Sequence, residues 1–309
     1  MEFNHYSVMK QECIDGLNIK EDGIYLDCTV GGAGHSYEIA KKLKNGKLLC
    51  LDKDTIALNT SKERLQEFKN VLFYHCDFKN FKEAMEFYNI EKFDGILIDL
   101  GVSSYQIDTA ERGFSYMHNA PLDMRMNQEQ LFSAYDLINK WSEADLSQIF
   151  YEYGEERFSR QIAKNIVLKR KEKPIETTFE LVEIIEKSVP AKFRFSGGHP
   201  AKRVFQALRI EVNDELEGLY DCLVNLARSL NKGGRMAVLS FHSLEDRAVK
   251  QAFNMLSSDC LCDKKLPICV CNHKAEIKLI NKKPIIATEE ELKQNSRSHS
   301  AKLRVIEKI

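Results

Sequence analysis

Short apolar runs alternate with amphipathic stretches through about the first hundred residues. The apolar runs predict four strands, and the last of them is nearly continuous in its apolar character, as in a buried parallel strand. The predicted strands cover residues 24–28, 47–52, 71–76 and 94–100, and helices are predicted at 35–44, 55–68 and 81–88. Repeated strand–helix units favour a doubly wound parallel sheet with right-handed crossovers.

The alternation stops after the fourth strand and returns later in the chain. Between 106 and 213 no run of comparable strand character occurs, and helices are predicted at 145–153, 158–169 and 179–187. We therefore predict an α/β fold in which one discontinuous domain, 1–105 with 214–309, is interrupted by an inserted, mainly helical domain, 106–213.

Apolar residues from Val204 to Leu230 repeat at spacings of three and four, which predicts one long helix or two joined ones. Gly233 and Gly234 are expected to end that helix. A strand at 235–241 then follows, and Ser243 is expected to cap the next helix.

Length and composition restrict the possible domain number, cellular location and cysteine chemistry only broadly. The chain has 309 residues, 43% hydrophobic and 29% charged, which suits two structural units with real cores. No apolar run approaches the roughly 20 residues that span a bilayer, and the first ten residues lack the regions of a secretory signal. We therefore expect a cytoplasmic protein without membrane contact, whose nine cysteines are mostly reduced thiols or metal ligands. The oligomeric state stays open.

Charge is distributed unevenly within a net charge of −1. Residues 106–156 hold 3 Lys/Arg against 10 Asp/Glu, a net of −7, and residues 157–210 hold 13 against 5, a net of +8. A positive stretch of that size can follow a phosphate backbone, and the alternative is a solvated helical surface.

A glycine-rich loop, Asp27-Cys-Thr-Val-Gly-Gly-Ala-Gly-His-Ser36, follows the first strand and opens a helix. Glycines let a backbone approach a ligand closely, and a helix N-terminus offers free amide donors. Asp52 follows Gly31 by 21 residues at the end of the second strand, where nucleotide-binding folds place the acid that binds ribose hydroxyls. The alternative is a tight turn beside a surface aspartate.

Two residues favour a methyl donor over NAD as the ligand of this loop. Tyr37 stands where the last glycine of G-x-G-x-x-G would be, and a pyrophosphate needs that close packing. Asp27 would repel a pyrophosphate but can accept a hydrogen bond from an ammonium group.

The fourth strand ends at Asp99, and the segment after it carries Ser103, Ser104 and Gln106. Ligands of a doubly wound sheet bind beyond the carboxyl ends of its strands, so these residues are expected to face cofactor and substrate. Turn chemistry is the alternative for each serine.

Blocks of sequence along nearly the whole chain resemble the bacterial 16S rRNA (cytosine-N4)-methyltransferases, the MraW family. The blocks that carry this resemblance are His5-Tyr-Ser-Val-Met9, the Asp27–Ser36 loop, Asp94 to Gln106, Glu111-Arg-Gly-Phe-Ser115, Pro121-Leu-Asp-Met-Arg-Met126, Tyr153-Gly-Glu-Glu-Arg-Phe158, His199 to Arg209, Ser240 to Arg247, and Ser298-His-Ser-Ala-Lys-Leu-Arg304. Tyr105 stands where the family usually has proline, which puts the conformation of the adjoining loop in question.

The resemblance implies a Rossmann-like class I methyltransferase that uses S-adenosylmethionine. It implies methylation of N4 of one cytidine, position 1402 in the usual rRNA numbering, in the decoding region of 16S rRNA within the small ribosomal subunit. It also implies that the helical insertion helps to bind RNA. Carried over by position, the cofactor contacts are Ala33, Gly34, His35, Asp52, Phe78, Asp99 and Gln106.

Methyl transfer to N4 needs a hydrogen-bond or proton acceptor near the cytosine amine, because the lone pair of that amine is delocalised into the ring. Asp99 is the candidate catalytic residue, and Ser104 and His242 are the other candidates for a general base. Lys202, Arg203 and Arg209 are candidate phosphate contacts. Four aromatic residues are candidates for stacking on RNA bases, with core packing as the alternative: Phe114, Tyr116, Phe193 and Phe195.

Four cysteines gather near the end of the chain, in a stretch that is not general to the family. Cys260, Cys262, Cys269 and Cys271 fall within twelve residues, with His273 next. Four sulfurs can satisfy tetrahedral zinc, but the common spacing is C-x-x-C and C-x-C bites more tightly. Reduced thiols on a mobile loop are therefore the preferred interpretation, and no metal site is assigned.

Three other functions compete with N4 methylation. A cytosine-C5 methyltransferase needs a cysteine nucleophile, and Cys28, Cys50 and Cys76 lie in or beside strands with no cysteine after a strand-end proline. An NAD-dependent oxidoreductase is disfavoured by Tyr37 and Asp27. A non-catalytic RNA-binding module on the same fold would not need the acids Asp52 and Asp99.

Overall fold

The computed structural model describes residues 7–194, 198–263, 266 and 268–309. It divides into two compact units, Met1–Gly101 with Leu216–Ile309, and Val102–Glu215. His5, Tyr6 and Phe195, which the sequence analysis singled out, lie outside the described residues. No described helix is long and apolar enough to cross a membrane.

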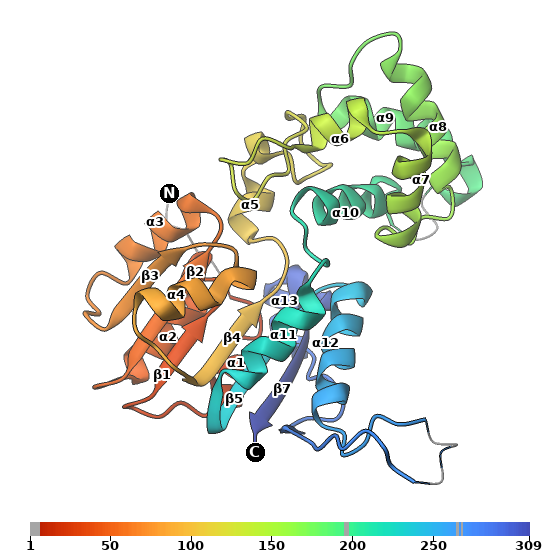
Figure 1. The fold of residues 1–309 in the computed structure, drawn as a ribbon. Helices are drawn as coiled ribbons and strands as arrows, with labels where there is room; N and C mark the ends of the chain where they lie inside the picture. Colours follow the sequence, from red (N-terminus) through yellow and green to blue (C-terminus); the bar gives the residue numbers. More distant parts are fainter. Residues whose placement is uncertain (1–6, 195–197, 264–265, 267) are drawn as a thin grey trace. The chain divides into compact units, whose positions relative to one another are not determined.

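The first unit is built on one seven-stranded sheet in the order β3-β2-β1-β4-β5-β7-β6 (Figure 1). Its strands are β1 (Ile24–Asp27), β2 (Lys47–Asp52), β3 (Val71–His75), β4 (Phe93–Asp99), β5 (Leu230–Ser240), β6 (Ile277–Leu279) and β7 (Lys302–Lys308). The first five strands run parallel, and β7 lies antiparallel between β5 and β6. This order is that of a doubly wound sheet, and the predicted α/β fold class is confirmed.

Side chains of successive strand residues point to opposite faces of this sheet, and helices cover both faces. Tyr25 and Leu48 belong to one buried cluster, whereas Leu26 and Leu49, the next residues along, belong to the other. Alternation with period two assigns each strand residue to one of two cores. The first core packs under α1 (Lys10–Leu17), α2 (Gly34–Lys42) and α3 (Thr55–Arg64), and the second under α4 (Phe81–Phe87), α11 (Leu219–Arg228) and α12 (Ser243–Leu256).

The apolar repeat after Val204 forms two helices, which is one of the two predicted arrangements, and the second ends at Arg228. The prediction that Gly233 and Gly234 end this helix is wrong. Gly233 and Gly234 instead lie inside β5, where Gly233 adopts φ +77° at a register shift between β4 and β5. A glycine there serves a β-bulge, because a left-handed φ costs it little. The strands β6 and β7 and the short helix α13 (Glu289–Gln294) were not predicted.

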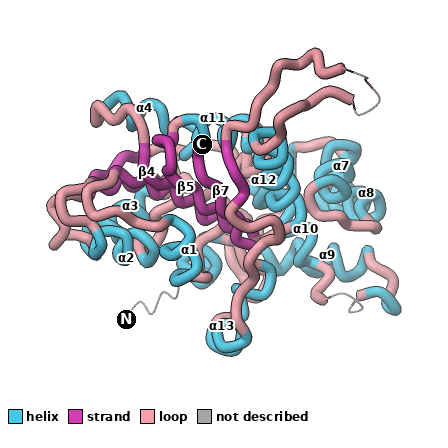
Figure 2. The backbone as a smooth tube through the Cα atoms, turned by 90° about the horizontal axis from the view of Figure 1, so that it is seen from below, coloured by secondary structure: helices cyan, strands magenta, loops and turns pink. Residues whose placement is uncertain are grey.

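The second unit consists of helices and loops, and Figure 2 shows no strand in the part of it that the structure describes. Its helices are α5 (Ser104–Asp108), α6 (Ala134–Lys140), α7 (Glu143–Glu152), α8 (Ser159–Arg170), α9 (Thr178–Ser188) and α10 (Ala201–Val212). They enclose a core of their own that includes Leu137, Phe150 and Leu208. The described part of this unit is therefore mainly helical.

Candidate active site

Hydrogen bonds with β2 and α3 fix the loop between β1 and α2. The Val30 N–H donates to the Leu51 carbonyl (2.9 Å), which ties the loop to β2. Ser61 Oγ donates to the Gly31 carbonyl (3.0 Å) and an Arg64 guanidinium nitrogen to the Gly32 carbonyl (2.7 Å). Ser61 and Arg64 were not predicted, although their i, i+3 spacing places them on one face of a helix.

Two residues of this loop adopt left-handed backbone conformations. Gly31 has φ +49°, and Ala33, at the N-cap of α2, has φ 60°. The first turn of α2 therefore begins without a side-chain cap. Its backbone N–H groups at Gly34 and beyond are directed away from the helix, as donors for a ligand.

Asp52 lies against this loop at the end of β2. Its Oδ2 accepts from the Gly31 N–H (2.8 Å) and its Oδ1 from the Asp54 N–H (2.9 Å). Burial raises the pKa of Asp52 to about 6, although these backbone hydrogen bonds lower it. Each carboxylate oxygen can accept two hydrogen bonds and here accepts one from the backbone, so both retain capacity for a ligand hydroxyl.

Asp27 has a structural role that its position in the sequence did not reveal. It is 1% exposed. Its two carboxylate oxygens accept from the Thr29 N–H (3.1 Å) and from Ser36 Oγ (2.6 Å). Burial raises its pKa to about 6. The expectation that Asp27 accepts from a ligand ammonium group is therefore not supported, since its side chain shapes the loop from inside.

Asp99 ends β4 beside the same loop, and its backbone N–H donates to Thr29 Oγ1 (2.8 Å). Its Oδ1 is buried and has no hydrogen-bond partner among the described residues. Burial, together with the charges of Asp27 and Glu245, raises the pKa of Asp99 to about 8. A buried oxygen without a partner is costly, so this carboxyl marks a place where a ligand donor fits.

His35 faces the other oxygen of this carboxyl. Its Nδ1 lies 3.8 Å from Asp99 Oδ2, and its Nε2 lies 3.0 Å from the Val8 carbonyl oxygen. Because a carbonyl can only accept, Nε2 is the protonated nitrogen and Nδ1 is the one turned toward Asp99. His35 is 6% exposed, so it contacts Asp99 from the buried side of the site.

Phe78 lies in the 3₁₀ turn Phe78–Asn80 after β3, where it is half-buried and packs on the core of the first unit. Asp77 caps this turn by accepting from the Lys79 N–H (3.0 Å), and its other oxygen pairs with Lys53 (3.3 Å). The remaining exposed part of the Phe78 ring is a candidate apolar wall for a ligand.

Gln106 and Ser104 belong to the second unit. Ser103 caps α5 in a capping box: its Oγ accepts from the Gln106 N–H (3.2 Å), and Gln106 Oε1 accepts from the Ser103 N–H (3.0 Å). Ser104 is the first residue of that helix. The capping box orders this turn around Tyr105, which stands where the family usually has proline.

His242 is a helix cap in this structure. Its Nδ1 accepts from the Glu245 N–H (3.4 Å), and its Nε2 lies 3.1 Å from Glu245 Oε1. It takes the capping position that was predicted for Ser243, which is the first residue of α12. The Nδ1 contact gives His242 a structural role, while its buried Nε2 makes no hydrogen bond among the described residues, so His242 also stays a candidate general base.

The cysteines of the competing C5 mechanism are not suited to nucleophilic attack. Burial raises the pKa of Cys28 and of Cys50 well above its ordinary value, and both are at most 1% exposed. Burial also raises the pKa of half-buried Cys76 to about 12. A catalytic thiol needs a depressed pKa and access to substrate, which these three lack.

The candidate RNA contacts of the second unit separate into two groups. Arg209 forms a bidentate ion pair with Glu215 (2.8 and 2.9 Å), which argues against its role as a free phosphate contact. Phe114 is buried in the core, and Tyr116 is stacked on His199 at 4.7 Å between ring centroids.

The second group is exposed. Lys202 and Arg203 are exposed on α10. Phe193 is partly exposed, with the Arg157 guanidinium 4.3 Å and the Lys192 ammonium 4.8 Å from its ring centroid. This group keeps the cations and the aromatic ring that contact with RNA requires.

The model of the MraW methylase family matches residues 2–309. The chain belongs to this family. It is 57% identical over all of both chains to a ribosomal RNA small subunit methyltransferase H of Clostridium botulinum (strain Loch Maree / Type A3). It is 55% identical, again over all of both chains, to the protein of that name from Clostridioides difficile (strain 630).

As a member of the MraW methylase family, the chain is a methyltransferase, and its cofactor is S-adenosylmethionine. The predicted family, enzyme class and cofactor are confirmed. Among solved structures, a putative rRNA-methylase from Clostridium thermocellum covers 99% of this chain with a TM-score of 0.44 and 11% identity, a likeness too loose to carry an argument.

Proposed function

We propose that this methyltransferase methylates N4 of a cytidine in the decoding region of 16S rRNA, the position numbered 1402, within the small ribosomal subunit. The observation that carries the proposal is the unpartnered Oδ1 of Asp99 beside the glycine loop of an MraW methylase. The relatives at 55% and 57% identity carry the name of small-subunit rRNA methyltransferases.

The carboxyl groups around the loop fit a cationic ligand better than a pyrophosphate. Asp52 and Asp99 border the same turn, and burial raises the pKa of both. A sulfonium and an ammonium group would relieve the cost of burying these carboxylates, whereas phosphates would add to it. S-adenosylmethionine, when bound, supplies an activated methyl group on a sulfonium.

We assign the cofactor contacts within the first unit as predicted. Gly34 and the start of α2 offer backbone donors to a carboxylate, and Ala33 and His35 shape that turn. Asp52 accepts from ribose hydroxyls, and Phe78 forms an apolar wall against the adenine. Gln106, in the second unit, is the remaining proposed contact.

Asp99 is the proposed catalytic residue. In its ionised form its free oxygen accepts a hydrogen bond from the cytosine amine, which localises the nitrogen lone pair and takes up developing positive charge. Because the pKa of Asp99 is raised to about 8, the carboxyl is also basic enough to receive the amine proton after transfer. Positioning supplies the rest of the acceleration.

We propose that the second unit is the RNA-binding domain. The exposed cations Arg157 and Lys192 border the ring of Phe193, and Lys202 and Arg203 add charge on α10. A phosphate backbone and an unstacked base match such a surface, since cations and aromatic rings recognise both. We also propose that the enzyme acts in the cytoplasm, where a substrate in the ribosomal subunit would be found.

The test is methylation of purified small ribosomal subunits with labelled S-adenosylmethionine, followed by nucleoside analysis of the 16S rRNA. We expect the label in N4-methylcytidine. Label in 5-methylcytidine would support the C5 mechanism, and stoichiometric RNA binding without label transfer would support a non-catalytic RNA-binding module. Either result would overturn the proposal.

A further inference from the structure

The 20 residues between α12 and β6, Ser257–Glu276, form an arm without helix or strand among its described residues. Figure 2 shows this arm projecting as a loop from the end of α12. Its base is closed by a hydrogen bond from the Glu276 N–H to the Leu256 carbonyl (2.7 Å). A loop of this length in a compact domain is uncommon and calls for a source of order.

Hydrophobic packing does not supply that order. Leu261 is 49% exposed, Ile268 74% and Val270 72%. Apolar side chains that remain in water contribute little to holding a segment in place. The order of the arm must therefore come from its polar and sulfur-containing groups.

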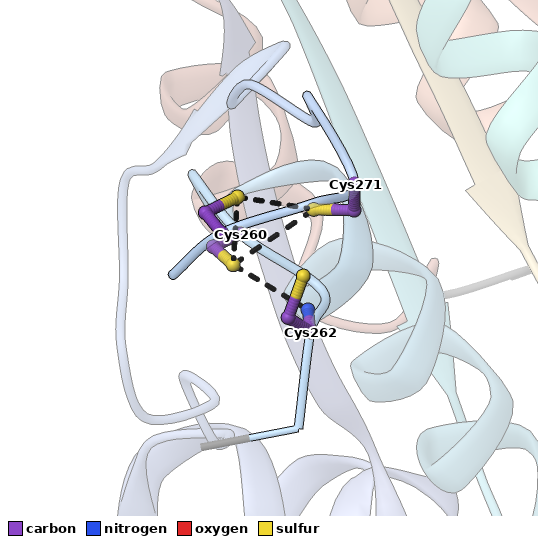
Figure 3. Close-up of side chains that lie close together, drawn as sticks. Cys260, Cys262 and Cys271 are labelled. Atoms are coloured by element: carbon purple, nitrogen blue, oxygen red, sulfur yellow. Dashed lines mark hydrogen bonds between the residues drawn. The ribbon is translucent and has the colours of Figure 1, made fainter. Parts of the chain in front are cut away.

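The four cysteines of the arm bring their sulfur atoms together, as Figure 3 shows for Cys260, Cys262 and Cys271. All four sulfurs lie within 4.8 Å of one another. The distances are 3.4 Å from Cys260 to Cys269, 3.7 Å from Cys269 to Cys271, and 3.8 Å from Cys271 to Cys260. With a zinc–sulfur bond of about 2.3 Å, the edge of a tetrahedral site is about 3.8 Å.

These distances answer the objection that the sequence raises, and they exclude a disulfide. The tight C-x-C spacing still spans a tetrahedral edge, because Cys269 and Cys271 lie 3.7 Å apart. A disulfide would require a sulfur–sulfur distance of about 2.05 Å, far below any of those observed.

Backbone donors surround the sulfurs in a reciprocal pattern. The Leu261 N–H donates to Cys271 Sγ (3.3 Å), and the Val270 N–H donates to Cys262 Sγ (3.3 Å). The central residue of each C-x-C segment thus supports the last cysteine of the other. Donors of this kind stabilise metal-bound thiolates and orient them toward a shared centre.

His273 does not belong to the cluster, although it follows it closely in the sequence. Its Nε2 lies 3.0 Å from the Met255 carbonyl oxygen at the end of α12. The candidate ligand set therefore consists of four sulfurs. Soft thiolate ligands in tetrahedral arrangement select zinc, and a fourth protein ligand leaves no position open for substrate.

We propose that Cys260, Cys262, Cys269 and Cys271 bind one structural zinc ion that fixes the arm. Bound by cysteines of both C-x-C segments, the zinc ion links these segments to each other. This link keeps their exposed apolar side chains in a defined arrangement. The site is separate from the residues proposed for methyl transfer, and the proposal stands independently of the RNA substrate.

The test measures metal in the full-length protein, purified under reducing conditions without chelators. We expect inductively coupled plasma mass spectrometry to find about one zinc ion per chain. Replacement of zinc by cobalt(II) should produce the sulfur-to-cobalt charge-transfer band and visible spectrum of a tetrahedral thiolate site. The double variant Cys260→Ser/Cys269→Ser should lose both, while the matched control His273→Ala, in the same arm, should keep both.

The wild-type result decides the matter even if the double variant fails to fold. Substoichiometric zinc near zero after incubation with zinc and reductant would overturn the proposal. So would an intact mass that shows disulfides in the reduced preparation, or iron in place of zinc. Retention of metal by the double variant would assign the site to other ligands and would equally overturn it.

Discussion

Two irregular segments of the first unit, the loop after β1 and the arm after α12, are ordered in different ways. In the loop, the Gly31 N–H donates to Asp52, and side chains of α3 donate to the carbonyls of Gly31 and Gly32. In the arm, the side chains of Ile268 and Val270 are exposed, and the contacts at its centre are hydrogen bonds to cysteine sulfurs.

The difference shows how an unsatisfied group can be interpreted. Around the loop, protein groups satisfy one another, and among the described residues the Oδ1 of Asp99 is the buried oxygen without a partner, which is why the proposal places a ligand donor there. In the arm, the thiols of Cys260, Cys262, Cys269 and Cys271 contact one another and backbone N–H groups of the described residues, so the arrangement as a whole supports the proposed metal site. The predictions below test this distinction.

The largest effect is expected from Asp99→Asn. Removing the acceptor for the amine proton should lower turnover by about 10²–10⁴-fold, with little change in fold. The measurement is label transfer to small ribosomal subunits. Asp94→Asn is the matched control, because Asp94 lies at the other end of β4 and accepts from the Ile24 N–H. Turnover near wild type for Asp99→Asn would remove it from catalysis.

Removal of zinc should affect the arm and spare the loop. A chelator should expose residues 257–276 to limited proteolysis, because the sulfurs no longer share a centre. Affinity for S-adenosylmethionine, measured by calorimetry before and after chelation, should stay constant. A parallel loss of cofactor affinity would mean that the two segments are not independent.

Asp52→Ala should weaken cofactor binding by about tenfold to a hundredfold, because ribose hydroxyls lose a charged acceptor and the Gly31 N–H loses its partner. Calorimetry with S-adenosylmethionine measures the change. Asp94→Ala serves as control, since it removes a carboxylate that also binds backbone but lies at the start of β4, away from the strand ends that carry Asp52 and Asp99. Equal affinities in both variants would show that Asp52 does not contact the ribose.

The smallest effect concerns the pH dependence of stability. The pKa of Asp99 is raised from an unfolded value of 3.8 to about 8, so the folded state favours the protonated carboxyl. Its contribution to stability is fully present below pH 3.8 and is lost progressively as pH rises from 3.8 to about 8. Asp99→Asn cannot ionise, so its melting temperature should gain on wild type between pH 3.8 and about 8, and the difference should stay level above that. A constant difference across that range would contradict the raised pKa.

The sequence by itself determined the parallel strands of the sheet, the helical insertion and the loop with its spaced acid. These are local properties, because alternation of side chains, glycine positions and strand-end acids follow from neighbours along the chain. Asp52 at the end of β2 and Asp99 at the end of β4 lie where that pattern placed them. The family blocks then specified the methyltransferase.

Only the tertiary structure decided which of these polar groups remain available. Asp27 turns inward to Ser36, and Arg209 pairs with Glu215, while Asp99 keeps a free oxygen. The three-residue strand β6 and the longer β7 were missed because they lie outside the strand–helix alternation and pair antiparallel to each other. The sequence likewise could not show that two C-x-C segments fold back on one another. Each of these outcomes depends on contacts between distant residues, and such contacts are fixed by packing and hydrogen-bond satisfaction in three dimensions.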